Sequence, residues 1–409
     1  MKSTKPYHPP QKILERYADV LVNFALNSGK GIKKGEVVIV TANESAKPLY
    51  AEVLRAIWKA GGHVIPRYNP DNEPWFKFDR IFFDHAEEHQ IMHFPSKMYK
   101  GLVEESDHSI YIISDTDMHS LQGVPPHKLV KRERALKPFK DWRFEKENQG
   151  EFTWTLGLYG TPAMAKEAKL SEKEYWNQII NACFLNESDP IKKWKEVYKQ
   201  LETYQKKLNA LKIEKVHVVG KDADLWITIG GTRKWMGGGG RNIPSFELFT
   251  SPDWRGTNGW IRFNQPLYRY GNLIDGIELE FKNGKVIGSK AKKNEEVLKH
   301  MIASPNADKV GEFSLTDHRF SRITKFMAET LFDENMGGPF GNTHIALGSS
   351  YDDCFNGDVK KVTKKQLKAM GFNDSPVHTD IVSTADRTVT AILKDGTEKV
   401  IYEKGRFVL

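Results

Sequence analysis

The chain has few cysteines and no long hydrophobic run, and both absences narrow its class. Cys183 and Cys354 are its only cysteines among 409 residues, which is too few for a disulfide framework, and they do not form a CxxC pair. No segment approaches the ~20 apolar residues that a membrane-spanning helix needs. The polar segment 1–11 lacks the apolar stretch of a signal peptide. We therefore expect a soluble protein of the reducing cytoplasm.

Several common motifs are also missing. No GxGxxG follows the first predicted strand, and Gly237–Gly240 lacks the spacing and the following helix of a dinucleotide-binding loop. No GxSxG nucleophile elbow occurs. His85, His89 and His93 have helical spacing, but Ala86 stands where an HExxH zinc site requires glutamate. We therefore interpret these histidines as part of a surface helix.

Aromatic residues and charges of both signs are abundant. The 22 Phe, 14 Tyr and 10 Trp indicate a folded core rather than disorder, and the chain length favours two domains.

The formal net charge of +8 arises from 61 basic and 53 acidic residues, which are spread along the chain. The densest basic cluster, residues 192–207, is interrupted by Glu196 and Glu202 on a predicted helix. We interpret it as a solvated helix face and expect no nucleic-acid partner.

The first half of the sequence has the pattern of a parallel sheet. The β-branched run 37–40 predicts a buried strand, and Asn43 or Ser45 can cap the helix that follows it. A second strand begins at His63. A strand, a helix and a strand within about 30 residues form a βαβ unit, and residues 110–113 predict a further buried strand. We therefore predict an open, mostly parallel α/β sheet.

The second half changes to a pattern of β-hairpins. Asn283–Gly284 and Asp395–Gly396 separate pairs of predicted strands, and such dipeptides favour hairpin turns because both residues tolerate positive φ. A long helix predicted over residues 189–211 precedes this half. We therefore predict an α/β N-terminal domain over 1–211 and an α+β, β-rich domain over 212–409.

Ionisable residues in apolar or glycine-rich surroundings gather in the last third of the chain. They are Glu247, Glu312, His344, His378 and Asp380. Alternate residues of a strand share a face, so His378 and Asp380 can reach one site together. Burying five ionisable groups is costly unless they are paired or coordinate a metal. Imidazoles and carboxylates suit zinc, cobalt, manganese or magnesium, and an excess of carboxylates suits two neighbouring ions. The sequence thus predicts a metal-dependent hydrolase.

Ordinary structural roles remain open for each of these residues. Glu247 and Glu312 could point to solvent from strand edges, and His344 could be a hydrogen-bonded core residue. Gly311 would let the backbone beside Glu312 approach a ligand closely, which favours Glu312 as a bridging ligand or proton acceptor. Two other function classes also stay open: a non-catalytic binder of nucleic acid or nucleotide, and a dinuclear-metal amidase or dipeptidase.

Five ordered motifs carry a family resemblance. They are NIPSFELFTSP (242–252), VGEFSL (310–315), LFDEN (331–335), HIALGSSY (344–351) and SPVHTDIV (375–382). In these motifs the sequence resembles the aminopeptidase T / aminopeptidase S family of metallopeptidases, and the similarity covers nearly the whole chain. The resemblance implies a homodimeric exopeptidase with an α/β N-terminal domain, a metal-bearing C-terminal domain and active sites enclosed in an internal cavity.

The resemblance also implies a ligand set and a reaction. The implied metal ligands are Glu247, Glu312, Glu334, His344, His378 and Asp380. The spacer Met336–Thr343 between the motif of Glu334 and His344 is longer than the family pattern leads us to expect. The implied cofactors are two divalent metal ions per subunit (Zn, Co, Mn or Mg).

The implied enzyme is a metal-dependent aminopeptidase that releases the N-terminal residue of peptides through a metal-bridged hydroxide. Glu312 and Tyr351 would be its catalytic residues. Tyr351 is expected in or near the metal site, where its hydroxyl would donate a hydrogen bond to the oxyanion of the tetrahedral intermediate.

Overall fold

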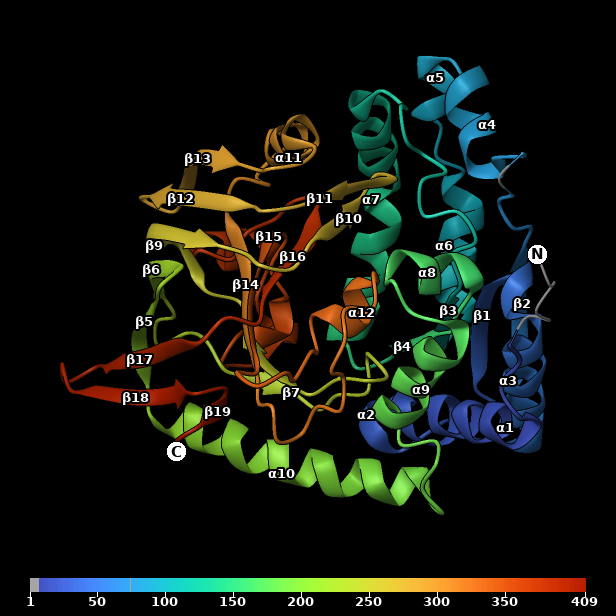
Figure 1. Ribbon diagram of the computed structural model, residues 1–409, viewed down its shortest axis with the longest axis horizontal. Helices are drawn as coiled ribbons and strands as arrows, with labels where there is room; N and C mark the ends of the chain where they lie inside the picture. Colours follow the sequence, from blue (N-terminus) through green and yellow to red (C-terminus); the bar gives the residue numbers. More distant parts are fainter. Residues whose placement is uncertain (1–6, 74) are drawn as a thin grey trace.

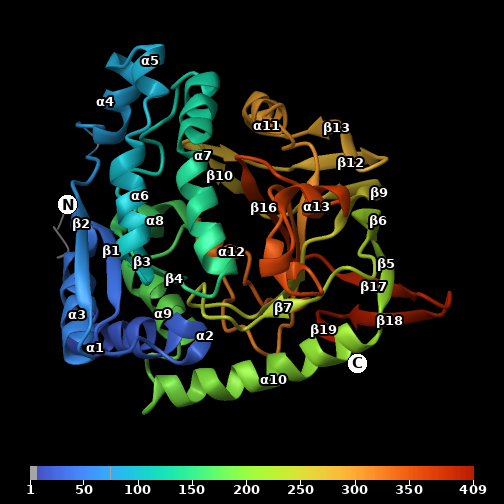
Figure 2. The same ribbon diagram turned by 180° about the vertical axis from the view of Figure 1, so that it is seen from behind.

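The computed structural model of the chain describes residues 7–73 and 75–409 (Figure 1). Residues 1–6 of the polar N-terminal segment, in which we expect no signal peptide, lie outside the described residues. A parallel sheet with its helices and a region of antiparallel sheets lie side by side in both views (Figures 1 and 2). This arrangement confirms the predicted fold class.

The parallel sheet is built around the predicted βαβ unit. Its strands have the order β2-β1-β3-β4, and every pair is parallel. The elements are β1 (Val37–Asn43), α3 (Lys47–Lys59), β2 (His63–Asn69), β3 (His108–Ile113) and β4 (Thr153–Leu158). The interior strand β1 is rich in β-branched residues, which is typical of a parallel strand that is covered on both faces.

The cap that we predicted for α3 is absent. Asn43 is the last residue of β1, and a short 3-10 turn, η2 (Glu44–Ala46), leads into α3 without a side-chain cap. The hydroxyl of Ser45 instead donates to the carbonyl oxygen of Ser114, 3.1 Å away. The cap prediction was wrong because Ser45 connects the carboxyl ends of neighbouring strands.

The helices of the first half form two groups. One group packs around the parallel sheet and continues along the antiparallel region: α1 (Gln11–Val20), η1 (Leu21–Ala25), α2 (Leu26–Gly29), α8 (Pro162–Glu167), α9 (Glu172–Ala182) and α10 (Pro190–Ala210). The other extends to the top of Figure 1: α4 (Phe78–His85), α5 (Glu88–Ile91), α6 (Ser96–Glu105) and α7 (Pro126–Asn148).

The histidines with helical spacing lie on the surface, as predicted, but not on one helix. His85, His89 and His93 are all exposed. The helix breaks after His85 because Ala86 is extended, with ψ 133°, and a capping box on Glu87 starts α5. Spacing alone predicted a continuous helix because it cannot show this break.

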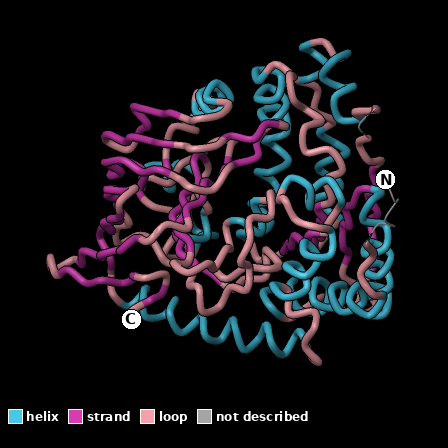
Figure 3. Tube along the Cα trace, viewed as in Figure 1, coloured by secondary structure: helices cyan, strands magenta, loops and turns pink. Residues whose placement is uncertain are grey.

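The second half contains two larger antiparallel sheets and a short hairpin, seen as the magenta strands gathered on one side of Figure 3. The larger sheet has the order β13-β12-β9-β6-β5-β17-β18-β19 and the smaller one β16-β15-β14-β8-β7. The predicted turns are confirmed: Asn283 and Gly284 join β12 to β13 with φ of 50° and 81°, and Gly396 between β17 and β18 has φ 85°.

The strands are β5 (Ile213–Gly220), β6 (Ala223–Thr228), β7 (Met236–Gly237), β8 (Glu247–Thr250), β9 (Asp253–Arg262), β10 (Leu267–Arg269), β11 (Asn272–Ile274), β12 (Glu278–Lys282), β13 (Lys285–Lys290), β14 (Val310–Thr316), β15 (Asn342–Gly348), β16 (His378–Ser383), β17 (Arg387–Leu393), β18 (Glu398–Glu403) and β19 (Arg406–Phe407). The helices of this half are α11 (Glu295–Ile302), α12 (Thr330–Asp333), η3 (Asp352–Cys354), η4 (Val359–Lys361) and α13 (Lys364–Ala369).

We retain the division into domains 1–211 and 212–409 as a proposal. It falls between the end of α10 at Ala210 and the start of β5 at Ile213. The two parts nevertheless share one continuous hydrophobic core. Among the described helices, none has the length and apolar character that crossing a bilayer requires.

An aromatic cluster connects the two halves of this core beneath the smaller antiparallel sheet. Trp194 of α10 is fully buried, and its indole N–H donates to the carbonyl oxygen of Cys183, 3.2 Å away. Its ring centroid lies 4.9 Å from that of Phe184 and 5.3 Å from that of Phe246. Phe246 immediately precedes Glu247, so the cluster supports the strand that carries a candidate ligand.

Replacing Trp194 with alanine should lower the free energy of unfolding by about 3–5 kcal/mol, because it leaves a cavity between the two halves. The measurement is the urea midpoint of unfolding. Trp58→Ala is the matched control, since Trp58 is 59% exposed and should change stability by no more than about 0.5 kcal/mol. Equal shifts in the two variants would contradict this view of the core.

Candidate metal centre

The candidate site lies on one face of the smaller antiparallel sheet. Side chains alternate along a strand, so Glu312, Ser314 and Thr316 of β14 share a face. Ser314 pairs with His344 of β15, and Thr316 pairs with Glu247 of β8. The register therefore brings Glu247, Glu312 and His344 together from three adjacent strands.

The strand β16 completes the arrangement. Ala346 of β15 pairs with Glu312 on one side and with Asp380 on the other. His378 lies two residues before Asp380, shares its face and pairs with Gly348. The small residues Ala346 and Gly348 leave space over which the longer ionisable side chains meet.

The first group of ionisable side chains is buried. Glu247, Glu312 and His344 offer ligand atoms that all lie within 4.8 Å of one another. Nε2 of His344 lies 3.3 Å from Oε2 of Glu247 and 3.4 Å from Oε1 of Glu312. This nitrogen has no hydrogen-bond partner among the described residues. A buried nitrogen without a partner needs an explanation, and a cation held between it and the carboxylates supplies one.

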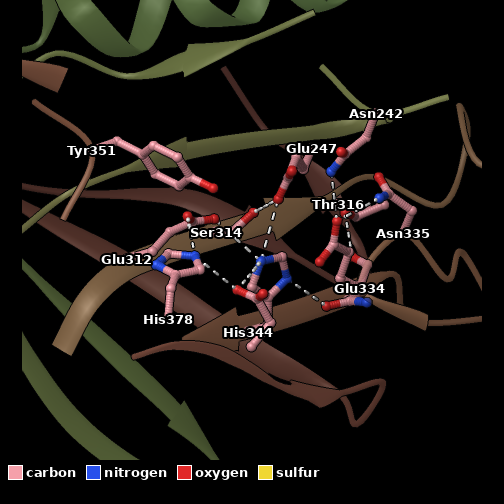
Figure 4. Close-up of polar contacts among 12 residues, drawn as sticks. Asn242, Glu247, Glu312, Ser314, Thr316, Glu334, Asn335, His344, Tyr351 and His378 are labelled. Carbon is pink, nitrogen blue, oxygen red and sulfur yellow. Dashed lines mark hydrogen bonds and ion pairs between the residues drawn. The ribbon is translucent and has the colours of Figure 1, made fainter. Parts of the chain in front are cut away.

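The second group shares Glu312 with the first. Glu312, His378 and Asp380 again offer ligand atoms within 4.8 Å of one another. Nε2 of His378 lies 3.5 Å from Oε2 of Glu312 and 3.6 Å from Oδ1 of Asp380. Glu312 thus turns one oxygen toward each imidazole (Figure 4). This is the arrangement expected of a carboxylate that bridges two cations.

Neighbouring oxygens orient both imidazoles. Nδ1 of His378 lies 2.8 Å from the carbonyl oxygen of Ser349, which can only accept, so Nδ1 carries the proton. Nδ1 of His344 lies 3.4 Å from Oδ1 of Asn342. In each ring the Nε2 lone pair is then available on the side of the carboxylates, which is the usual way that a protein prepares a histidine for metal binding.

Burial and charge act on these groups in opposite directions. Burial alone would lower the pKa of His344, but Glu247 and Glu312 outweigh it and raise that pKa well above its usual value. Burial likewise opposes protonation of His378, yet Asp380 and Glu312 raise its pKa to about 9. Burial would raise the pKa of Glu312, but the two imidazoles lower it to about 2. The carboxylates therefore require positive charge, from protons or from metal ions.

The donor set and its spacing fit two divalent cations. Two ligand atoms bound to one tetrahedral zinc ion at about 2.0–2.2 Å stand roughly 3.4 Å apart. The imidazole–carboxylate distances within the two groups span 3.3–3.6 Å. Such distances are too long for hydrogen bonds of normal strength but suit ligands that share an ion.

Tyr351 lies beside the second group, on the loop after β15. Its ring centroid is 5.0 Å from that of His378 and 5.6 Å from that of Phe249. The phenol hydroxyl points toward the carboxylates (Figure 4). Burial, followed by the charge of Glu312, raises the pKa of Tyr351 well above its usual value. The hydroxyl therefore keeps its proton and can act as a hydrogen-bond donor.

Glu334 is close to the site but belongs to neither group of three. Its Oε1 accepts from Nδ2 of Asn242 at 2.9 Å and from Nδ2 of Asn335 at 3.4 Å (Figure 4). Burial, and then the charges of Asp380 and Glu247, raises the pKa of Glu334 well above its usual value. The structure thus brings together five of the six predicted ligands and holds the sixth beside them.

Sequence reasoning missed the polar residues that hold the acidic groups. The hydroxyl of Ser314 donates to Oε2 of Glu247 at 2.6 Å. Strand alternation could have found Ser314, which lies two residues after Glu312. Nothing in the sequence links Asn242 to Glu334, because that contact depends on how two distant loops fold.

Gly311 has a different role from the one predicted. A Cβ at this position would collide with the carbonyl oxygens of Gly348 and Ser349. The backbone of Gly311 therefore approaches the backbone at the end of β15 rather than a ligand. The register of β14 and β15 shifts between Val310 and Glu312. The glycine permits this irregularity immediately before Glu312.

The site opens into a cavity of about 700 Å³ between the two halves of the molecule. Among its lining residues are Glu247, Glu312, Glu334, Tyr351, His378 and Asp380. The volume is within the range of cavities that bind small ligands. The fold and this site together define the class: a two-part protein with a carboxylate-rich metal site in the cavity between its parts.

The comparison with protein families agrees with this class. The description "Thermophilic metalloprotease (M29)" matches residues 10–407, and the chain belongs to this family of metalloproteases. Membership implies a divalent metal cofactor. The resemblance predicted from the five motifs is thereby confirmed.

Relatives of the chain match it over almost their full length. Aminopeptidase PepS of Streptococcus thermophilus is 28% identical over 97% of this chain and 98% of its own. Aminopeptidase T of Thermus thermophilus is 26% identical over 97% of this chain and 99% of its own. The solved structure described as wild-type AmpT from Thermus thermophilus aligns with a TM-score of 0.79 and 25% identity, covering 98% of this chain and 100% of that one.

Replacing His344 with alanine should reduce Zn²⁺ affinity by at least about tenfold, because the substitution removes a side chain that binds the metal directly. Loss of a residue that only supports a metal ligand already lowers affinity by about 10–100-fold. Equilibrium dialysis followed by elemental analysis measures the bound metal. His217→Ala is the control, since His217 lies on β5 outside the site and contacts Asp224. Unchanged zinc binding by the His344 variant would exclude it from the ligand set.

Proposed function

We propose that the protein is a metal-dependent aminopeptidase that hydrolyses the N-terminal residue from peptides. The observation that carries this proposal is the shared carboxylate of Glu312, placed between two imidazole–carboxylate groups in a large cavity. The relatives named aminopeptidases support it. A related dinuclear-metal amidase or dipeptidase is the alternative, and a panel of peptide and amide substrates separates the two.

The proposed cofactors are two divalent ions per subunit, with Zn, Co, Mn or Mg as candidates. Glu247 and His344 would hold one, His378 and Asp380 the other, and Glu312 both. Glu334 would be an additional ligand. When bound, such ions lower the pKa of water toward neutrality and polarise a carbonyl group.

The protein's own side chains would perform the remaining steps. Glu312 has two alternative roles: it would be the ligand that both ions share or, with one oxygen left free, it would accept a proton from the attacking water. Its carboxylate is ionised at neutral pH, as either role requires. Tyr351 would donate its hydroxyl hydrogen to the oxyanion of the tetrahedral intermediate, a role that can contribute about 10²–10³-fold in rate. Ser314 and Asn242 would keep Glu247 and Glu334 in place through their hydrogen bonds.

Activity on aminoacyl-4-nitroanilides should require both the cations and Glu312. Exhaustive chelation should abolish turnover, and Co²⁺ or Zn²⁺ should restore it. Glu312→Gln loses the anionic oxygen that either role of Glu312 needs, so it should lower kcat by about 10²–10⁴-fold without unfolding the protein. The measurements are initial rates and a circular dichroism spectrum.

The matched control is Glu280→Gln, which should keep full activity because Glu280 lies on β12 of the larger antiparallel sheet, away from the site. Undiminished activity after chelation would exclude the proposed function. An active Glu312 variant would remove this residue from the mechanism.

We also propose a homodimer, supported by an apolar surface on the arm formed by residues 75–105. The helix α4 of this arm has no buried residue. Large apolar side chains with at least a third of their surface exposed are Trp75, Phe76, Phe78, Ile81, Phe82, Met92 and Met98. A concentration of exposed large apolar side chains in one segment is typical of protein–protein contacts, and a second copy of the chain is the partner that we propose.

Sedimentation velocity should show a dimer for the wild-type chain and a monomer for the double variant Phe78→Ser, Phe82→Ser, because two polar side chains would be buried in the contact. Ile287→Ser changes an exposed apolar residue on β13, away from the arm, and should leave the dimer unchanged. A dimer that survives the arm substitutions would place the contact elsewhere.

The proposed location is the cytoplasm. Cys183 and Cys354 are both buried and free, which agrees with a compartment where thiols stay reduced.

A further inference from the structure

The cavity has a basic end away from the candidate metal centre. Lys30, Lys33 and Lys360 line it together with the residues around the start of β4. The backbone N–H of Asn27 donates to Oγ1 of Thr153 at 3.0 Å, which holds α2 beside the start of β4 (Figure 2). Lys30 follows directly after α2. Lys360 reaches the same place, because its Nζ lies 3.9 Å from where a Cβ on Gly150 would be.

The strand β4 connects this basic end to the metal centre. Its residue Leu156 donates through its backbone N–H to the carbonyl oxygen of Arg241 at 2.8 Å and accepts from Ile243 at 3.0 Å. The intervening Asn242 contacts Glu334 beside the metal site. Thr153 and Leu156 are three residues apart, and a strand rises about 3.3 Å per residue. The basic end therefore lies roughly 10 Å along the strand from the polar contacts of the metal centre.

Some of the basic side chains at this end are already paired with carboxylates, and others are not. Oε1 of Glu147 lies 3.0 Å from Nε of Arg241, and Asp353 also binds this guanidinium, so its charge is already offset. Lys33 lies 3.7 Å from Glu36. Among the described residues, Lys30 and Lys360 form no ion pair. Two ammonium groups at the cavity edge are thus available to an anionic ligand.

We propose that Lys30 and Lys360 bind the C-terminal carboxylate of the peptide substrate, an inference that rests on the proposed aminopeptidase function. A short peptide is positive at its N-terminus and negative at its C-terminus. The cavity has the complementary order, with carboxylates at the metal centre and free ammonium groups at the other end. An extended chain spans about 3.3–3.6 Å per residue, so at least about three residues after the cleaved bond are needed to cover the distance. The substrate class is peptides of about four or more residues with a free C-terminus.

The test compares kcat/KM for peptide acids with that for the corresponding C-terminal amides. The peptides are Leu-Gly and Leu-Gly-Gly-Gly, and leucine 4-nitroanilide provides a substrate without a carboxylate. We expect the wild-type enzyme to prefer the tetrapeptide acid over its amide by about fivefold, the scale of exposed ion pairs. The dipeptide should show no preference. High salt should weaken the tetrapeptide preference because it screens exposed charges.

The double variant Lys30→Gln, Lys360→Gln should lose the preference through a higher KM for the tetrapeptide acid, while kcat and the nitroanilide rate stay unchanged. Lys34→Gln, Lys361→Gln is the matched control. Lys34 and Lys361 lie close in sequence to Lys30 and Lys360, are also exposed and are not part of the cavity lining, so this variant should retain the preference.

Equal kcat/KM for the tetrapeptide acid and amide in the wild-type enzyme would overturn the inference, as would an equal loss in the control variant. Either result with intact nitroanilide hydrolysis would leave the proposed function standing. Absence of hydrolysis of every substrate in the presence of metal would instead refute the proposed function.

Discussion

The structure of the site depends on one constraint, the concentration of carboxylates around two imidazoles on a single sheet face. Glu247, Glu312 and Asp380 lie within 4 Å of Nε2 of His344. The ligand oxygens of Glu247 and Glu312, and those of Glu312 and Asp380, also lie within 4.8 Å of each other, and like charges at such distances repel strongly in a buried site. The arrangement is stable only if positive charge is present between them, which is why bound divalent metal accounts for the donor set better than structural hydrogen bonding does.

The fold supplies the rigidity that this concentration of charge requires. Four adjacent strands of one sheet carry the five grouped ligands, and small residues between them keep the space open. The aromatic cluster around Trp194 lies behind Glu247. Arg241 links the helix α7, through Glu147, to Asp353 of the second half. Residues of both halves thus form the walls of the cavity, so the shape of the cavity depends on how the two halves pack against each other.

Much of this architecture could be predicted from the sequence, because periodicity and turn chemistry are local. The βαβ unit, α10 and the Asn-Gly hairpin followed directly from them. The helix α7 was not predicted, because only Leu129 and Ala135 of its 23 residues are buried and it lacks an apolar stripe. The placement of Glu312 and Asp380 on either side of Ala346 could not be predicted either, because the register between strands that are distant in sequence leaves no local pattern. The family motifs supplied that convergence, but not the hydrogen bonds of Ser314 and Asn242 or the lysines of the cavity.

The central claim is that Glu312 is shared by two cations. Anomalous X-ray scattering from crystals grown with Zn²⁺ or Co²⁺ tests it most directly. The account predicts two anomalous peaks about 3.5–4 Å apart, on either side of the Glu312 carboxylate, with His344 beside one and His378 beside the other. A single peak, or two peaks that Glu312 does not contact, would contradict it.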